Sequence, residues 1–232
     1  TTTTDVDAQG WGAGLGLLSV GNSTVTLVES THATTADVSS PIVDTRDGVA
    51  VVATDVTTAD AKSVATSINF LGLGMTVGAA VADVDLSPEI TARTSGAHVE
   101  GDLTVTADAD LVGRALAWSL SGSLTVAQSG ALALANVDAG LLALVDDLTQ
   151  VRDGAAIVRT DGRFVSEADA TGANGGIVGI GGSVAVAETK GFNSATFLGN
   201  ADDVALTVSA IAEDRADAYA RGTNGGIVTV NA

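Results

Sequence analysis

The sequence lacks cysteine, has only two prolines, and contains very few aromatic residues for a chain of 232 residues. The absence of cysteine excludes disulfide scaffolds and thiolate metal sites. Aromatic residues make up 3% of the chain although 46% of it is hydrophobic, so alanine, valine, leucine and isoleucine must build the core. Ligand and substrate sites usually recruit aromatic side chains, and their scarcity argues against a fold built around such a groove.

Positive charge is also scarce, with 10 lysines and arginines against 28 acidic residues and a formal net charge of −18. This charge repels phosphate backbones and excludes nucleic-acid binding. The balance suits a chain that works outside the cell in salty or calcium-containing water. The chain begins without methionine or a basic signal region, so we expect a removed leader or a piece of a longer chain. The uncharged stretches alternate with a period of two residues, and no membrane span is predicted.

Two kinds of segment recur along the chain. The first is rich in glycine: residues 171–178 (TGANGGIV) match residues 221–228 (RGTNGGIV) at an offset of 50, and residues 15–28 match residues 71–84 at an offset of 56. The second kind alternates small apolar with polar residues. Residues 204–220 show it most clearly, and further copies begin near residues 49, 103 and 154. Such alternation is typical of a half-buried strand.

The two kinds of segment follow each other about every 25 residues, so a composite unit takes about 50 residues. Repeats of this length indicate a stacked array, in which each unit buries its face only against its neighbours. We therefore predict an all-β fold, a β-solenoid (parallel β-helix) with rungs of about 25 residues in composite repeats of about 50. An antiparallel β-sandwich is the alternative, because the regular spacing of turns permits it as well.

A single elongated repeat domain is expected to cover residues 1–232. Its approximate repeats are 15–70, 71–117, 118–174 and 175–226, and a fifth begins at 227–232. Because the last segment starts a further strand and stops, we expect the repeat to continue. The continuation would lie either in a longer chain or in a neighbouring subunit.

Three consecutive segments resemble one repeat of large bacterial surface adhesins. They are residues 181–187 (GGSVAVA), 193–199 (NSATFLG) and 203–210 (DVALTVSA), and residues 101–107 (GDLTVTA) resemble the last of them again. This order of segments is similar to that of the leukotoxin-like filamentous adhesins, in which a Gly-Gly-x-Val-x-Val strand comes before a Gly-Asp-Val-x-Val-x-Ala strand. The resemblance implies a secreted, cell-surface, β-helical stalk, and it carries no catalytic residue onto this chain.

Pairs of aspartates are the candidate metal ligands, because calcium takes six to eight oxygen ligands and spaced carboxylates can supply them. We single out Asp108 with Asp110, and Asp202 with Asp203, as calcium ligands. The competing interpretation is a hydrated acidic face that binds no ion. No other cofactor is expected.

No catalytic motif is present, since the sequence has neither a Gly-x-Ser-x-Gly elbow nor a phosphate-binding loop. His32 and His98 lack a partner histidine at ligand spacing and are expected to be ordinary strand or surface residues. We therefore predict a non-enzymatic structural segment of an extracellular bacterial fibre or filamentous adhesin, located outside the cell or at its surface. It would self-associate end to end, or continue in a longer chain, through residues 1–10 or 227–232.

The alternative function is a β-helix that binds or cleaves polysaccharide, with cell-surface or matrix glycans as partners. Trp11 and Trp118 are the side chains that would stack on sugar rings, and paired aspartates would act as acid and base in a cleaving enzyme. Against this, Trp118 shares its alternation with Leu116 and Leu120, which favours packing between layers.

Overall fold

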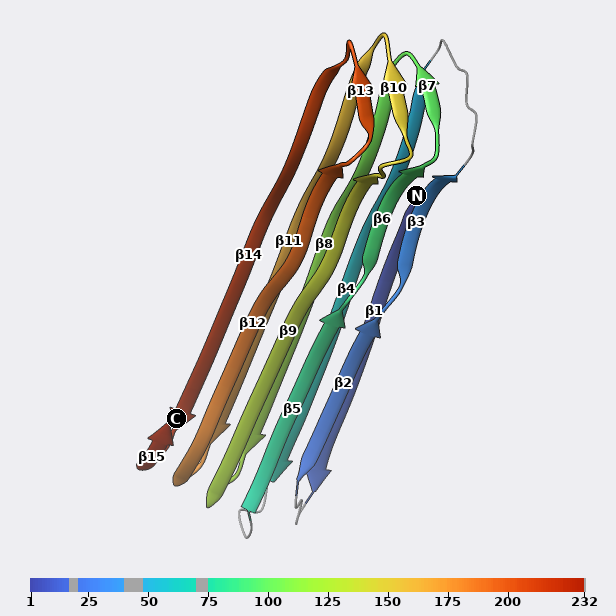
Figure 1. Ribbon diagram of the computed structural model, residues 1–232. Coiled ribbons are helices and arrows are strands. Elements are labelled where there is room, and N and C mark those ends of the chain that lie inside the picture. The colour runs from blue at the N-terminus through green and yellow to red at the C-terminus, as the bar shows by residue number, and fades with distance from the viewer. Residues whose placement is uncertain (17–20, 40–47, 70–74, 232) are drawn as a thin grey trace.

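The computed structural model describes residues 1–16, 21–39, 48–69 and 75–231. Every regular element in these ranges is a β-strand. The strands form two long sheets and a short third one (Figure 1). The described ranges hold no helix that is long and apolar enough to span a membrane.

The first long sheet, called sheet A, contains five strands that correspond to the alternating segments of the sequence. In chain order they are β1 (Thr2–Gly16), β4 (Val49–Asn69), β8 (Leu103–Gly122), β11 (Ala155–Gly175) and β14 (Ala205–Gly225). They lie side by side in that order, so each strand pairs with the strand of the next composite repeat. Val49 pairs with Leu103, and Ala155 pairs with Ala205, as the repeat in the sequence predicts.

The second long sheet, called sheet B, contains the glycine-rich segments. Its strands are β2 (Asn22–Ser30), β3 (Ala33–Ser39), β5 (Met75–Leu86), β6 (Glu89–Ser95), β9 (Val126–Val145), β12 (Val178–Phe197) and β15 (Val228–Asn231). Both β5 and β6 pair with β9, so they are two halves of one interrupted strand. The interruption contains Pro88, which has no N–H to donate to a neighbouring strand.

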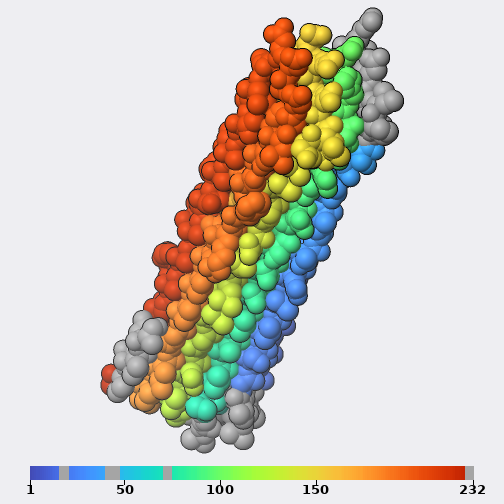
Figure 2. Space-filling view, in the orientation of Figure 1, coloured from blue at the N-terminus to red at the C-terminus, as the bar shows by residue number. Residues whose placement is uncertain are grey.

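Three short strands link the end of one sheet B strand to the start of the next sheet A strand. They are β7 (His98–Glu100), β10 (Gln150–Arg152) and β13 (Asn200–Asp202), and they form the third sheet. The chain thus runs along sheet A, returns along sheet B and crosses over to begin again. We call one such circuit a coil. Figure 2 shows the successive coils side by side, as bands from blue to red.

All pairings between the described strands are parallel. An all-β fold with parallel strands is therefore confirmed, and the antiparallel β-sandwich is wrong for this part of the chain. The predicted rung is also wrong as the unit that stacks, because β11 pairs with β14 of the next composite repeat. The long strands of the complete coils take 20 or 21 residues each, so the predicted rung spans only half a coil.

The core lies between sheets A and B and is built from small side chains. Inward and outward residues alternate along β8, and Leu103, Val105 and Leu111 are among its fully buried residues. Most of the other inward residues of β8 and β9 are alanines, which allows the two sheets to approach closely. This is the kind of core that the composition predicts.

Phe164 on β11 is the largest fully buried side chain in the described part of the chain. Its ring occupies space left open by two glycines, one on its own strand and one on β12. A Cβ at Gly162 would lie 2.7 Å from the ring, and one at Gly191 would lie 2.9 Å from it. The two glycines and the phenylalanine are therefore complementary in shape.

Candidate functional site

The outer face of sheet A carries the first predicted calcium pair. Because the strands are parallel and in register, equivalent residues of successive coils form rows across this face. Asp108 on β8 lies between Thr54 on β4 and Asp161 on β11. Asp110 lies one row further on, beside Arg163. These rows border a hollow of about 460 Å³ that Arg159 also lines.

Arginines already form ion pairs with two of the carboxylates at this hollow. Nη1 of Arg163 lies 2.8 Å from Oδ1 of Asp110, and Arg159 forms an ion pair with Asp161. Burial raises the pKa of Asp108, and the negative charge of Asp161 raises it further, although Arg159 opposes both effects. Asp108 is available here as a calcium ligand, but the ion would have to compete with two guanidinium groups for Asp110 and Asp161.

The second predicted pair lies in a different part of the fold. Asp202 ends β13, and Asp203 lies in the turn to β14 with a φ of 57°. The structure therefore brings Asp108 close to Asp110, and places both on a different sheet from Asp202. Within the described ranges, no three histidine or acidic side chains are grouped so that they could hold a metal ion. Calcium binding stays a prediction.

Substituting Asp108 with asparagine should stabilise the fold at neutral pH. The pKa of Asp108 is raised above 3.8 in the folded chain, so the folded state favours the protonated carboxyl. The stability that this proton gives is present at low pH and is lost as the pH rises through the raised pKa. Asparagine is uncharged at every pH, so the variant does not lose this stability as the pH rises. We therefore expect its melting temperature at pH 7 to exceed that of the wild type by on the order of 1–2 °C.

Asp110→Asn is the matched control for this prediction, since it removes the partner of Arg163. It should give no increase in melting temperature. A melting temperature for Asp108→Asn at or below that of the wild type at pH 7 would contradict the expected cost of a charged, partly buried carboxylate beside Asp161. The same pair of variants, melted with calcium and with chelator, tests whether Asp108 takes part in ion binding.

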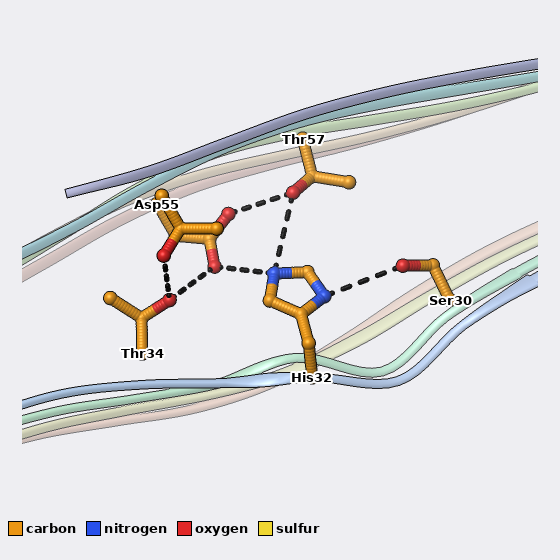
Figure 3. A network of polar contacts seen from close by, with 6 residues as sticks. Ser30, His32, Thr34, Asp55 and Thr57 are labelled. Atoms are coloured by element: carbon orange, nitrogen blue, oxygen red, sulfur yellow. Dashed lines mark hydrogen bonds and ion pairs between the residues drawn. The ribbon is translucent and has the colours of Figure 1, made fainter.

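A buried polar network, shown in Figure 3, joins the first two coils. The carboxylate of Asp55 on β4 is fully buried, and Nε2 of His32 lies 2.6 Å from its Oδ2 atom. The hydroxyls of Thr34 and Thr57 donate to the same carboxylate over 3.0 and 2.7 Å. Oγ of Ser30 lies 3.3 Å from Nδ1 of the imidazole. Each oxygen of the carboxylate thus has at least one partner inside the stack.

The network contains a serine, a histidine and an aspartate, the residue types of a nucleophilic triad. Its position between the sheets and the saturation of Asp55 indicate a structural latch between β4 and the segment from Ser30 to Thr34. The expectation that His32 is an ordinary strand residue missed this role. Asp55 continues the inward positions of Val51 and Ala53, so the alternation of β4 contained the signal for a buried carboxylate.

The tryptophans do not pack between the layers. Trp118 is 42% exposed and Trp11 is 67% exposed, both on the outer face of sheet A. The inward positions on either side of Trp118 are Ala117 and Ser119, both fully buried. Packing between layers is therefore wrong for Trp118, because leucines at the same alternation, such as Leu116, also face outward.

The two ends of the stack are open along their strands. Within the described residues, β1 pairs only with β4 and β14 pairs only with β11. The segment 1–10, predicted to make contacts, lies largely in β1 at this free edge. Of the other predicted segment, 227–232, the last residue lies outside the described ranges, and β15 already pairs with the first residues of β12. Among the described strands, the remaining free edge at that end belongs to β13, β14 and the rest of β12.

The inner face of β14 is also uncovered. Leu206 and Val208 continue the inward rows of Ala156 and Val158 on β11. Both residues of β11 are fully buried, whereas Val208 is 44% exposed. The last coil therefore presents an apolar surface and a free strand edge together.

Comparisons of the chain with models of protein families, with curated proteins and with solved structures gave no match. The resemblance to filamentous adhesins accordingly stays a prediction. The function must be inferred from the arrangement of the chain itself.

Proposed function

We propose that this chain is a β-solenoid segment of an extracellular fibre or of the stalk of a filamentous adhesin, and that it has a structural rather than a catalytic role. The observation that carries the proposal is the pair of open ends on a regular parallel stack. A free strand edge is a template for another strand, and proteins that avoid association cover or charge such edges. Further coils, from a longer chain or from a second copy, would extend the stack in the same geometry.

The added coil would bury the apolar inner face of β14. In the same way, β14 and its neighbours bury the inner face of β11 in the existing stack. Leu206 and Val208 would then become core residues, equivalent to Ala156 and Val158. The hydrophobic effect and the new hydrogen bonds would both favour stacking.

One inward residue of β14 restricts which coil can be added. Asp214 continues the inward row of Phe164, so a stacked coil would enclose its carboxylate. Burying a charge is costly unless it is paired and hydrogen-bonded. The buried Asp55, with its histidine and two threonines, shows how this fold satisfies such a group. The next coil should offer donors to Asp214 in a similar way.

The geometry also fixes the dimensions of a fibre. Stacked strands are about 4.8 Å apart, so each coil lengthens the stack by only about 5 Å. Strands of about 20 residues span about 65 Å across it. We therefore expect a broad filament, about 65 Å or more in width, whose strands run across its axis.

Substituting Val208 with lysine should prevent end-to-end assembly. A stacked coil would bury the ammonium group without a partner, whereas the isolated chain leaves the side chain in water. We expect the concentration needed for assembly to rise at least about a hundredfold. Analytical ultracentrifugation over a range of concentrations, with electron microscopy of the same samples, measures it.

Ile211→Lys is the matched control, because Ile211 lies on the same strand but faces outward and is 48% exposed. It should assemble like the wild type. The proposal fails for a non-covalent fibre if the wild-type chain stays monomeric at every concentration. It also fails if Val208→Lys assembles as readily as Ile211→Lys.

A further inference from the structure

Both tryptophans and the single tyrosine of the chain lie on the outer face of sheet A. Trp11 pairs with Val64, and Val64 pairs with Trp118, so the two indoles lie in one row across the strands. Tyr219 lies in the adjacent row, which it shares with Leu116. The three aromatic residues thus belong to β1, β8 and β14, which are the first, third and fifth strands of the sheet.

The strands that carry the aromatic residues are evenly spaced, and all three side chains are partly exposed. Lys62 lies over the ring of Trp11, with Nζ 5.3 Å from the ring centre, and Arg221 lies over the ring of Tyr219 at 4.4 Å. Two strand spacings, about 10 Å, separate the strand of each aromatic residue from that of the next. Tyr219 is 47% exposed, comparable to Trp118. Val64 faces outward between the indoles and yet is only 5% exposed, as expected if the flanking rings shield it. The two indoles therefore form a line along the stacking direction, and Tyr219 lies one row, about 7 Å, to the side of it.

Two adjoining hollows accompany this line. One of about 290 Å³ is lined by Gln9, Lys62 and Asp60 among others, and one of about 270 Å³ by Asp169 and Tyr219. Arg114 and Leu116 line both. The hollows therefore offer carboxylate, amide, ammonium and guanidinium groups beside Tyr219, which lines one of them, and one row away from the two indoles.

We propose that this face binds an extended neutral polysaccharide that runs across the strands, along the stacking direction. The C–H faces of sugar rings pack on the electron-rich faces of aromatic rings. Sugar hydroxyls both donate and accept, and the side chains in the hollows provide both kinds of partner. A sugar unit in an extended chain is about as long as one strand spacing, about 5 Å, so every second sugar would meet an aromatic ring.

The charge of the face selects the class of polysaccharide. The two polar rows beside the indoles contain the carboxylates of Asp7, Asp60, Glu167, Asp169 and Asp217. With a net charge of −18 on the whole chain, an acidic polysaccharide would be repelled. A neutral chain meets no such penalty.

The arrangement supports binding rather than cleavage. Nε of Arg114 lies 3.0 Å from Oε2 of Glu167, and its Nη1 lies 3.7 Å from Oδ1 of Asp60. Arg114 is therefore the shared ion-pair partner of both carboxylates. Glycoside hydrolysis uses two carboxyl groups that act on the substrate, and both members of this pair are bound to Arg114 instead.

The two tryptophans make the binding measurable, because both lie on the proposed face. We would titrate the full-length chain with neutral β-1,4-linked gluco- and xylo-oligosaccharides of increasing length and follow indole fluorescence. Trp11 and Tyr219 are separated by four strand spacings, about 19 Å, so affinity should rise with length up to about five sugars. Polygalacturonate, an acidic polymer, should not bind.

Trp118→Ala should weaken binding at least about tenfold, since it removes the central one of the three aromatic side chains. Phe192→Ala is the matched control: this exposed aromatic residue lies on β12 in sheet B, and its loss should leave affinity unchanged. Thermal melts of both variants check that the fold is intact. For Trp118→Ala, which alters the indole signal, and for its control, affinity electrophoresis in gels containing the polysaccharide replaces fluorescence.

Three results would overturn the inference: no binding to any neutral polysaccharide tested, equal binding to polygalacturonate, or equal affinities for Trp118→Ala and the wild type. Binding of a protein partner through the same face would give the first of these. The assay does not depend on fibre formation, because Val208 faces the inside of the stack. Val208→Lys should bind like the wild type whether or not the chain assembles.

Discussion

Replacing Phe164 with alanine should lower the free energy of unfolding by about 3–5 kcal/mol. The ring is fully buried and fills the space beside Gly162 and Gly191. Its inward neighbours on β11, Gly162 and Ser166, are too small to fill the vacancy, so a cavity would remain. Urea titration followed by circular dichroism measures the loss.

A double-mutant cycle tests whether shape complementarity is the cause. Gly191→Ala alone should destabilise the chain, because its Cβ would lie 2.9 Å from the ring of Phe164. Combined with Phe164→Ala, the same methyl group should be neutral or stabilising, since it enters the cavity. Gly130→Ala serves as the control, because no atom lies within 4 Å of the added Cβ. Strictly additive effects of Phe164→Ala and Gly191→Ala would contradict this explanation.

Replacing His32 with alanine should destabilise the first coil by about 3 kcal/mol, since it removes the closest partner of a buried carboxylate. Thr34 and Thr57 would remain, but two hydroxyls do not replace the imidazole of a 2.6 Å contact. In a stack of this kind the effect should be local. Hydrogen exchange should therefore accelerate in β1 and β2 and leave β9 and β11 unchanged.

The second variant for this prediction replaces the whole pair with apolar side chains, His32→Leu with Asp55→Val. Removing both polar groups avoids the unpaired charge, so most of the lost stability should return. His98→Ala, which removes the other histidine, should have little effect. If His32→Ala melts like the wild type, the network does not act as a latch.

The strands were predictable from the sequence because small apolar and polar residues alternate in them, as in residues 204–220. The spacing of the composite repeats was predictable as well, and the pairing of β11 with β14 reproduces it. The alternation does not distinguish half a coil from a whole one, because a chain that turns back after every strand shows the same pattern whether or not each strand stacks on the next one in sequence. Which strands stack on each other is a long-range property that local alternation does not contain, whereas the offset of about 50 residues between similar segments predicted the parallel register of β11 and β14.

The side-chain sites were harder to predict for the same reason. Trp11 and Trp118 lie far apart in the sequence and share a row only because β4 lies between their strands. His32 meets Asp55 only because sheet B folds over sheet A. In addition, apolar residues such as Leu116 and Trp118 lie on the outer face, so hydrophobicity alone misidentifies the inside of this fold.

Winding the chain into coils has a mechanical consequence. Tension between the two ends of the chain would act along the hydrogen bonds that join one coil to the next, and the terminal coil would peel away before its neighbours. Each coil released would add about 50 residues, or about 170 Å of extended chain. A stalk wound in this way would yield in long, separate steps under load, absorbing work while the coils still in place kept their structure.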